Sequence, residues 1–354
     1  MLLEVKPLDT LFFRDGKPFS WGEETWAEGI FPPYPSTLYG ALRTLWFAEN
    51  IEELKKAKIP DDPTKNIKIN GIFIKREGII YFPIPMDFVK KKNEKENKVF
   101  LLSFLKDYEF VTNLNFQFLS TLEVDEVETP AGLVSFSVLT QYLLGKIKNE
   151  VAFLPNEKFY KLEPKIGIAR NRITHTVDAE EGKLYRVNMI RLKKKVSLII
   201  DVETKGINLP ERGFKKLGGE GKAVFFQKIE DERIKTLKEG IKEELKKQIQ
   251  KKSRFKLYLL TPAIFENGYF PKEIYDGLKL KLVSCVCGKP VYIGGFDIKH
   301  RRPKTMYRAV PAGSVYFFFL EKGEPEKVLE KLHYKRISDY KKEEGFGLSL
   351  IGVW

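Results

Sequence analysis

The sequence Leu217-Gly218-Gly219-Glu220-Gly221-Lys222 runs directly into the apolar stretch Ala223-Val224-Phe225-Phe226. Three glycines within four positions permit positive φ angles and the close approach of a second backbone. We expect a helix before them, over residues 209–217, and a strand after them, because β-branched and aromatic residues follow. Such a unit exposes unpaired N–H groups beside Lys222, which suits an anionic ligand such as a nucleic-acid phosphate. The alternative interpretation is a helix C-cap glycine followed by a tight turn.

A second glycine-rich stretch near the C-terminus, Glu344-Gly345-Phe346-Gly347, also precedes a predicted terminal strand. The two halves of the chain begin alike, because Leu3-Glu4-Val5-Lys6-Pro7 and Tyr258-Leu259-Leu260-Thr261-Pro262 each run from a strand into a proline. Each half can therefore be read as β-α-β-β-α-β, with its glycine loop just before the final strand. This order predicts an α+β protein made of two ferredoxin-like (RRM-like) domains with insertions.

Predicted helices set the limits of these domains. Besides the helix before the first glycine loop, helices are predicted over residues 36–50, 272–278 and 326–332. A further helix carries apolar side chains at helical spacing and is otherwise charged, so it is interpreted as a linker helix. We expect an N-terminal domain over residues 1–230, with an insertion and a projecting hairpin at about 165–192, then the linker helix over 231–253 and a C-terminal domain over 254–354.

Composition narrows the class of partner. At 354 residues the chain exceeds the usual size of one domain, which agrees with two. Its net charge of +14 favours an anionic partner, nucleic acid first, although many basic proteins are merely soluble. The sequence has no apolar run of about 18 residues and no signal-peptide layout, so we expect a cytoplasmic protein without a membrane partner. Scarce glutamine beside abundant lysine and glutamate indicates a thermophile.

The predicted helix at residues 36–50 is a candidate phosphate site. The prolines of Phe31-Pro32-Pro33-Tyr34-Pro35 enforce an extended approach, and Ser36 is a good N-cap residue. The first turn of such a helix presents free N–H groups and the positive end of the helix dipole. An ordinary capped helix without a ligand is the alternative.

Two basic stretches are further candidates for nucleic-acid contact. Arg170, Asn171 and Arg172 lie on one arm of the predicted hairpin, where such side chains can hold a sugar–phosphate backbone. A solvated hairpin without a ligand is the alternative interpretation. The second stretch is the basic loop Lys299-His300-Arg301-Arg302-Pro303-Lys304.

Four stretches together carry a family resemblance. They are Lys6-Pro7-Leu8-Asp9-Thr10-Leu11-Phe12-Phe13-Arg14-Asp15-Gly16, Pro35-Ser36-Thr37-Leu38-Tyr39-Gly40-Ala41-Leu42-Arg43, residues 217–221, and Arg308-Ala309-Val310-Pro311-Ala312-Gly313-Ser314-Val315-Tyr316. With a duplicated ferredoxin-like chain and a glycine loop before the last strand, they resemble the RAMP superfamily of CRISPR proteins. More narrowly, the chain is similar to the third subunits of Cmr (type III-B) effector complexes. The resemblance spans nearly the whole chain, and its first and last motifs are specific in combination.

The resemblance implies a non-catalytic subunit in antiviral defence. Such a subunit would bind the guide (CRISPR) RNA near its 5′ tag, dock on the large polymerase-like subunit and contact the backbone subunits, with no cofactor and no metal. The candidate RNA-binding residues are Arg14, Ser36, Thr37, Arg43, Arg170, Asn171, Arg172, Gly218, Gly219, Gly221, Lys222, Lys299, Arg301, Arg302, Lys304 and Arg308. Gly345 and Gly347, in the less basic glycine stretch, are expected to contact a partner subunit.

Catalytic motifs are scarce in the sequence. None of its three histidines, His175, His300 and His333, is followed by aspartate, and no Cys/His cluster has zinc spacing. His175 and His300 lie in basic, polar surroundings, so either could be a general base in metal-free RNA cleavage or simply face a phosphate or solvent. The alternative function is therefore a metal-independent endoribonuclease that processes CRISPR repeat RNA, because that enzyme shares the duplicated fold. We expect no enzyme activity.

Overall fold

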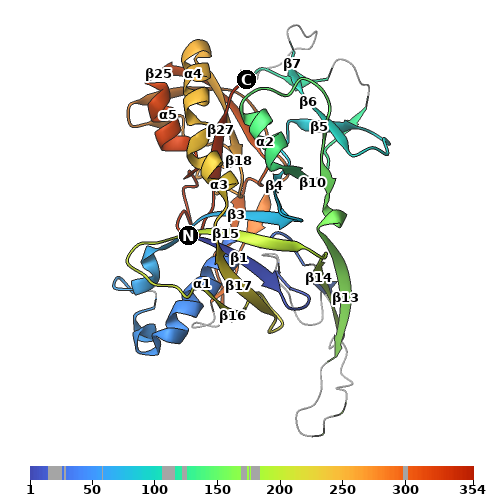
Figure 1. Cartoon of the computed structure of the whole chain (residues 1–354), viewed down its shortest axis with the longest axis vertical. Helices are drawn as coiled ribbons and strands as arrows, with labels where there is room; N and C mark the ends of the chain where they lie inside the picture. The colour runs from blue at the N-terminus through green and yellow to red at the C-terminus, as the bar shows by residue number, and fades with distance from the viewer. Residues whose placement is uncertain are drawn as a thin grey trace.

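The computed structural model of the chain describes residues 1–14, 26–27, 29–57, 59–105, 116–121, 126–168, 174, 176, 184–297 and 302–354. The protein is of mixed α/β class, with two large antiparallel sheets, several small sheets and few helices (Figure 1). None of the helices within these ranges is long and apolar enough to cross a membrane.

The first sheet is built around β1, Leu2–Pro7, in which the alternate side chains Leu3 and Val5 are apolar and buried. Its eight strands follow the order β12-β10-β4-β3-β15-β1-β17-β16. The remaining strands are β3 Ile67–Arg76, β4 Ile79–Pro83, β10 Gly132–Ser135, β12 Leu154–Pro155, β15 Val196–Thr204, β16 Arg212–Lys216 and β17 Ala223–Ile229.

Helix α1, Pro35–Glu49, packs against this first sheet. Its apolar residues recur at helical spacing, so one face of the helix is apolar. Burying each large apolar side chain fully contributes roughly 1.5–3 kcal/mol. The buried residues of the helix are Pro35, Leu38, Leu42, Leu45 and Phe47. Two 3₁₀ helices, Ile51–Lys56 and Pro63–Asn66, connect α1 to β3.

A long insertion separates β4 from β15. It contains helix α2, Phe136–Leu143, a 3₁₀ turn at Asn156–Lys158 and the hairpin of β13, Tyr160–Ile168, with β14, Leu184–Leu192. The two hairpin strands pair antiparallel along their whole length and lie at the lower right of Figure 1. These two strands lie within or next to the range of the predicted hairpin, about 165–192. Short strands complete the insertion and its edges: β2 Trp26–Ala27, β5 Phe88–Lys91, β6 Lys98–Leu101, β7 Ser103–Phe104, β8 Leu119–Ser120, β9 Val127–Glu128 and β11 Val151–Ala152.

The second sheet repeats the arrangement of the first around β18, Arg254–Leu259. Its six strands follow the order β19-β20-β25-β18-β27-β26. The other strands are β19 Ile274–Tyr275, β20 Leu278–Val286, β25 Val315–Lys322, β26 Lys335–Arg336 and β27 Leu348–Gly352. Helix α5, Pro325–Leu332, lies between β25 and β27 in the chain, close to its predicted position. Two small ladders complete this half: β21 Val291–Ile293 with β24 Tyr307–Ala309, and β22 Phe296–Asp297 with β23 Arg302–Pro303.

The linker between the sheets is helical, as predicted. It runs through α3, Glu232–Lys235, a π-helical turn, Thr236–Gly240, and α4, Lys242–Lys252. Its apolar stripe is buried in a hydrophobic cluster that also holds residues of the insertion and of the second sheet. The stripe consists of Ile234, Leu237, Ile241, Leu245 and Ile249. One core thus joins both halves of the chain, and the domain boundaries at residues 230 and 254 stay predictions.

A buried carboxylate also ties the halves together. Asp201 of β15 is 1% exposed and forms an ion pair with Lys238 of the π-helical turn at 2.7 Å. The hydroxyl of Tyr334, which belongs to the second half, donates a hydrogen bond of 2.9 Å to the same carboxylate. Because a buried carboxylate is costly without such partners, these contacts fix the position of the linker between the sheets.

Two predicted helices are wrong. Residues 209–217 contain β16, whose side chains alternate in exposure because the strand pairs with β17 at the edge of the first sheet. Residues 272–278 contain β19 and a turn at Gly277, where φ is +72°, so the chain reverses into β20. Of the two helices predicted for each half, the described residues therefore keep α1 in the first half and α5 in the second.

Candidate nucleic-acid interface

The first glycine loop is the turn of the β16–β17 hairpin. The Leu217 N–H donates to the Lys222 carbonyl at 2.8 Å, and the Gly219 N–H donates to the Phe12 carbonyl at 2.8 Å. Gly218 has φ of +77°, and a Cβ there would lie 2.4 Å from the Phe12 oxygen. The interpretation as a helix C-cap is wrong. Glycine is needed at position 218 because the N-terminal loop lies against the turn. The Phe12 carbonyl of that loop accepts the hydrogen bond of the Gly219 N–H, which was expected to face a phosphate.

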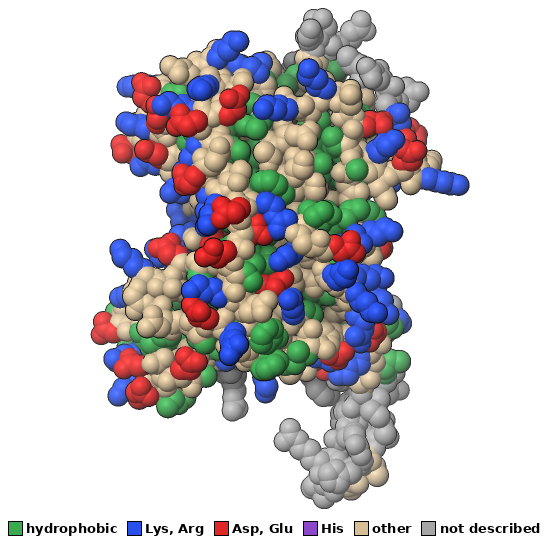
Figure 2. All heavy atoms as spheres, in the orientation of Figure 1, with side chains coloured by type: hydrophobic (Ala, Val, Ile, Leu, Met, Phe, Trp, Pro, Cys, Tyr) green, Lys and Arg blue, Asp and Glu red, His purple; other side chains and the backbone are tan. Residues whose placement is uncertain are grey.

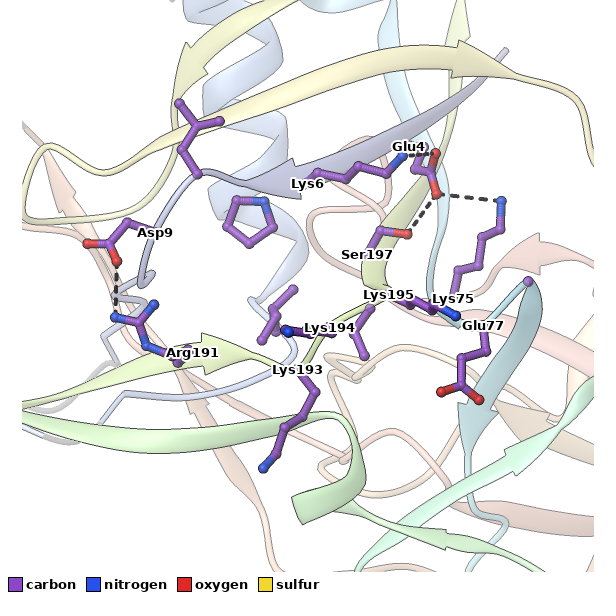
Figure 3. Close-up of a pocket in the computed structure, with 15 residues that line it drawn as sticks. Glu4, Lys6, Asp9, Lys75, Glu77, Arg191, Lys193, Lys194, Lys195 and Ser197 are labelled. Atoms are coloured by element: carbon purple, nitrogen blue, oxygen red, sulfur yellow. Dashed lines mark hydrogen bonds and ion pairs between the residues drawn. The ribbon is translucent and has the colours of Figure 1, made fainter.

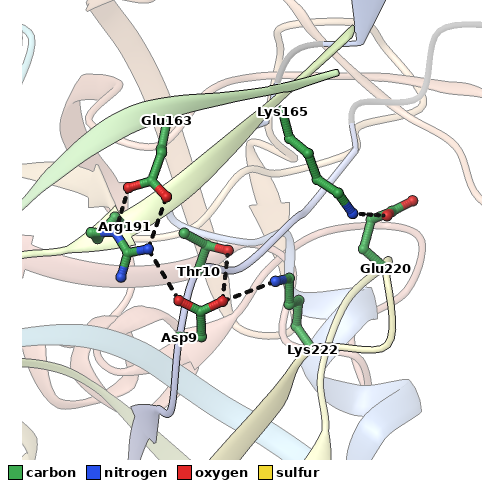
Figure 4. Close-up of polar contacts among 7 residues, drawn as sticks. All are labelled: Asp9, Thr10, Glu163, Lys165, Arg191, Glu220 and Lys222. Atoms are coloured by element: carbon green, nitrogen blue, oxygen red, sulfur yellow. Dashed lines mark hydrogen bonds and ion pairs between the residues drawn. The ribbon is translucent and has the colours of Figure 1, made fainter. Parts of the chain in front are cut away.

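Charged side chains join this loop to the base of the β13–β14 hairpin (Figure 4). Lys222 forms an ion pair with Asp9 at 3.1 Å, and Arg191 of β14 contacts the other oxygen of Asp9 at 3.0 Å. Lys165 of β13 reaches Glu220 in the glycine loop at 2.9 Å. The hydrogen bond from Lys222, with lesser contributions from Thr10 and Arg191, lowers the pKa of Asp9 to about 2. Asp9 lies in the segment that follows the first strand. We call the place where this segment, the glycine loop and the base of the hairpin meet the junction.

A groove of about 590 Å³ opens next to the junction (Figure 3). Its walls come from β1, from the turn between β14 and β15 and from the turn between β3 and β4. Basic side chains gather on the right edge of the molecule over β13 and β14 (Figure 2). The charged residues that line the groove are Glu4, Lys6, Asp9, Lys75, Glu77, Arg191, Lys193, Lys194 and Lys195.

The groove's carboxylates are already neutralised by neighbours. Glu4 pairs with Lys6 at 3.0 Å and with Lys75 at 3.5 Å, and it accepts a hydrogen bond of 2.8 Å from Ser197. Burial alone would raise the pKa of Glu4, but these contacts and one from Gln227 lower it to about 2. Figure 3 shows Lys6 pointing toward Glu4, away from the lysines of the β14–β15 turn.

The turn between β14 and β15 carries the excess positive charge. Lys193, Lys194 and Lys195 are consecutive and exposed, and none forms an ion pair with any residue that the structure describes. Their backbone is fixed, because the Lys193 N–H donates to the Phe159 carbonyl at 2.8 Å and the Glu77 N–H donates to the Lys195 carbonyl at 3.0 Å. Three ammonium groups on this fixed backbone, without carboxylate partners among the described residues, are suited to the phosphates of a nucleic-acid strand. We name residues 193–195 the lysine turn.

The start of α1 differs from its prediction. Tyr34 occupies the N-cap position without a side-chain hydrogen bond, so Ser36 is not the cap. The Ser36 hydroxyl instead donates to the carboxylate of Glu344. The carboxylate of Glu344 therefore lies beside Ser36, where a phosphate was expected. Thr37 is the next residue of the helix. Arg43 binds Asp62 and donates to the Thr64 hydroxyl at 2.6 Å, which ties α1 to the 3₁₀ turn.

The second glycine loop is buried. Gly345 has φ of +104° and would place a Cβ 2.8 Å from Ile69, and Gly347 has φ of +73° and would place one 2.4 Å from the Ser338 amide nitrogen. The Thr261 hydroxyl donates to the Gly345 carbonyl at 2.8 Å. The chain itself therefore fills the space beside both glycines, where the sequence had predicted a partner subunit.

The other predicted residues are scattered. Arg302 and Lys304 lie at β23, Arg308 lies on β24, and all three are exposed. Arg14 is exposed and forms a β-bridge with Gly29. The remaining candidates lie outside the described residues: Arg170, Asn171, Arg172, Lys299 and Arg301. The structure thus brings Lys222 and the first glycine loop to the junction. Of the second-half candidates, Arg302, Lys304 and Arg308 lie at the two small ladders instead.

The structure describes one of the three histidines. His333 is 1% exposed, its Nε2 donates to the Leu237 carbonyl at 2.7 Å, and its Nδ1 accepts from the Ile351 N–H at 3.2 Å. Burial lowers the pKa of its imidazole to about 4. Both ring nitrogens are used in the core, which suits a structural role. Within the described ranges no cluster of histidine, cysteine, aspartate or glutamate could hold a metal ion.

Sequence reasoning missed the lysine turn. A signal was available, because three consecutive lysines, Lys193-Lys194-Lys195, directly follow the predicted hairpin. A short lysine run is by itself most often a solvated turn. What identifies it is the groove and the absence of carboxylate partners in the described part of the chain, which only the fold reveals.

Comparisons with known proteins agree on one family. The family model described as "CRISPR-associated protein (Cas_Cmr3)" matches residues 3–354. A chain in the cryo-EM structure of the Type III-B Cmr-beta bound to cognate target RNA is 19% identical over 90% of this chain and 86% of that chain, with a TM-score of 0.51. The same complex with target RNA and AMPPnP gives 19% identity over the same shares and a TM-score of 0.49. No curated protein matches.

Proposed function

The chain belongs to the Cas_Cmr3 family of CRISPR-associated proteins, and we propose that it is a non-catalytic RNA-binding subunit of a type III-B (Cmr) effector complex. The observation that carries RNA binding is the groove of about 590 Å³ with the lysine turn at its edge. Lys6, Lys75 and Arg191 already pair with carboxylates there. The lysine turn therefore supplies the net positive charge that a phosphate backbone would neutralise.

The ligand is the guide RNA near its 5′ tag, and the large polymerase-like subunit and backbone subunits are the protein partners. Family membership supports this assignment, and the solved relative of similar fold is part of a Type III-B Cmr complex bound to target RNA. Single-stranded RNA suits a groove that offers point charges without a base-reading surface, since ammonium groups bind phosphates and leave sequence unread.

Each half of the chain is a ferredoxin-like unit that has lost one helix. In this fold the strands of β-α-β-β-α-β take the spatial order 4-1-3-2. The order β17-β1-β15-β3 in the first sheet and β27-β18-β25-β20 in the second both support this assignment. The first unit retains its first helix, α1, and the second retains its last, α5.

The proposal of a non-catalytic role competes with that of a metal-independent endoribonuclease. His333 was not a candidate base, and both of its ring nitrogens are used within the core. His175 and His300 are left as the residues to test. Full-length protein incubated with CRISPR repeat RNA, with and without magnesium, should leave the RNA intact. Cleavage that disappears in the His175→Ala or His300→Ala variant would establish the endoribonuclease instead.

Binding of single-stranded, tag-bearing guide RNA across a salt series tests the main proposal. Replacing all three residues of the lysine turn by glutamine should flatten the slope of log K against log salt by up to about 2, at roughly 0.7 per phosphate contact. The matched control replaces Lys235 and Lys242 by glutamine, because each pairs with a glutamate on the linker. An unchanged slope in the triple variant would remove the groove from the RNA path, and absence of RNA binding by the wild type would overturn the function.

A further inference from the structure

The two small ladders of the second half form a separate finger. Strands β21 and β24 pair at its base, and β22 and β23 pair beyond them, so residues 291–297 run against residues 302–309. The Lys304 N–H donates to the Gly295 carbonyl at 2.9 Å and joins the two ladders. We call these two segments the finger.

Opposite faces of the finger differ in chemistry. Ile293 is 1% exposed and packs in a small core, whereas its neighbour Tyr292 is 43% exposed. Tyr292 lies directly opposite Arg308 in the ladder, and such pairs project from the same face. Farther along, Phe296 is 56% exposed. The face with Tyr292 and Arg308, which we call the outer face, therefore joins an aromatic ring to a guanidinium group, and Phe296 exposes a second ring farther along the finger. Large aromatic side chains are usually buried in proteins.

The charge of the finger is positive. Its two segments contain one carboxylate, Asp297, and the three cations Arg302, Lys304 and Arg308. Arg308 forms no ion pair within the described residues, and its side chain is exposed. Aromatic residues and arginine are common in protein interfaces too, but lysine is depleted there. The lysine of the finger, Lys304, is exposed, and exposed rings among exposed cations are the combination by which proteins hold single-stranded nucleic acid.

We propose that the outer face of the finger is a stacking platform for unpaired bases of an RNA strand. The rings of Tyr292 and Phe296 stack on bases, and Arg308, beside Tyr292, binds the phosphate between them. The two aromatic residues are four positions apart, so their Cα atoms lie at most about 14 Å from each other. Stacking on a ring does not read sequence, because every base has a π-face. This inference rests on the proposed function and adds base contacts to the phosphate contacts of the lysine turn.

Abasic RNA separates base contacts from phosphate contacts. Full-length protein is titrated with a labelled oligouridine and with an abasic ribose–phosphate strand of equal length. Tyr292→Ala and Phe296→Ala should each weaken oligouridine binding by about 5- to 100-fold and leave abasic binding unchanged. Tyr292→Phe should retain affinity, because it keeps the ring. Arg308→Ala should weaken binding of both strands and reduce the salt dependence. Tyr269→Ala is the matched control, since Tyr269 is 48% exposed outside the finger.

The outcomes distinguish this inference from the proposed function. If the wild type binds RNA with strong salt dependence but Tyr292→Ala and Phe296→Ala bind oligouridine normally, the platform is wrong and the RNA-binding function stands. Loss of complex assembly without loss of RNA binding would make the finger a protein contact and overturn the platform. Failure of the wild type to bind either strand would overturn both proposals.

Discussion

The two glycine loops share a sequence pattern and lie in opposite environments. In the first loop, at residues 217–222, the glycines are exposed, and a Cβ on Gly221 would meet open space. In the second loop, at residues 344–347, Gly345 and Gly347 are buried against the chain's own backbone and side chains. Positive φ is common to both loops. The neighbour of each glycine therefore decides whether the loop belongs to a surface or to the core.

The largest expected effect is that of Gly347→Ala. Gly347 has φ of +73°, and the new Cβ would lie 2.4 Å from the backbone nitrogen of Ser338. A backbone atom cannot rotate away as a side chain can, and burial prevents the loop from moving outward. We expect a loss of at least about 3 kcal/mol in the free energy of unfolding, measured by urea denaturation.

Gly221→Ala is the control for this substitution. Gly221 also has positive φ, at +62°, but no atom lies within 4 Å of its ideal Cβ. Only the backbone penalty remains, so the loss should be about 1 kcal/mol. Equal losses in the two variants would show that φ alone governs both loops, and the contrast between core and surface would be unfounded.

The next expected effect is a pH dependence of stability near the second glycine loop, which leads into β27. His333 binds the Leu237 carbonyl and the Ile351 N–H of that strand while neutral. Burial lowers the pKa of His333 from 6.5 to about 4. Between these two pH values the unfolded chain binds a proton at this histidine and the folded chain does not. Stability is then complete above pH 6.5 and falls between pH 6.5 and 4, by about 3 kcal/mol in all.

Urea denaturation from pH 7.5 to 4.5 measures this loss. His333→Gln removes the titrating group, so its stability should be lower at pH 7 and should vary less over the same range. Parallel curves for the wild type and the variant would contradict the assignment of the pH dependence to His333.

The features that the sequence predicted well are local ones, or ones supported by several separate motifs. The β13–β14 strands and the stripe of the linker helix, such as Leu237 and Leu245, follow from side-chain period alone. The family resemblance rested on several separated motifs and was confirmed by the match over residues 3–354. Positive φ at Gly218 and Gly347 also agrees with the expected role of glycine at tight turns.

What could not be predicted depended on contacts between distant segments. Residues 209–217 form a strand because β17 offers an edge to pair with, a fact absent from the local sequence. The phosphate site expected at Ser36 is occupied by Glu344, which comes from the other half of the chain. The sequence around Gly345 and Gly347 does not record Ile69 or Ser338 as neighbours, so the burial of these glycines could not be predicted.

A smaller effect is expected for Gly218→Ala in the first loop. Its φ is +77°, and a Cβ would lie 2.4 Å from the Phe12 carbonyl oxygen. Because the loop is exposed, it can move outward and lose the hydrogen bond from Gly219 to Phe12. We expect a loss of about 2 kcal/mol, between those of the Gly221 and Gly347 variants, in the same urea measurement. A loss as large as that of Gly347→Ala would mean that the junction is as rigid as the core.

The smallest expected effect on stability is that of Asp9→Asn. Asp9 is 56% exposed and pairs with Lys222 and Arg191 across the junction. Exposed ion pairs contribute little, so the free energy of unfolding should change by less than about 1 kcal/mol. The contrast with the second loop is that this substitution should change binding, because it frees Lys222 beside the groove, while Arg191 stays paired with Glu163.

RNA binding should therefore become tighter and more salt-dependent in Asp9→Asn, with the slope steeper by about 0.7 for each cation that gains a phosphate. The pKa of Asp9 is lowered to about 2, so its carboxylate is charged at pH 7 and the difference should persist down to pH 4. Asp276→Asn is the control for net charge, because it removes an exposed partner of Lys331 outside the junction. If both substitutions change RNA affinity alike, the gain reflects net charge alone. If only Asp9→Asn tightens binding, the first glycine loop and the junction are part of the RNA surface.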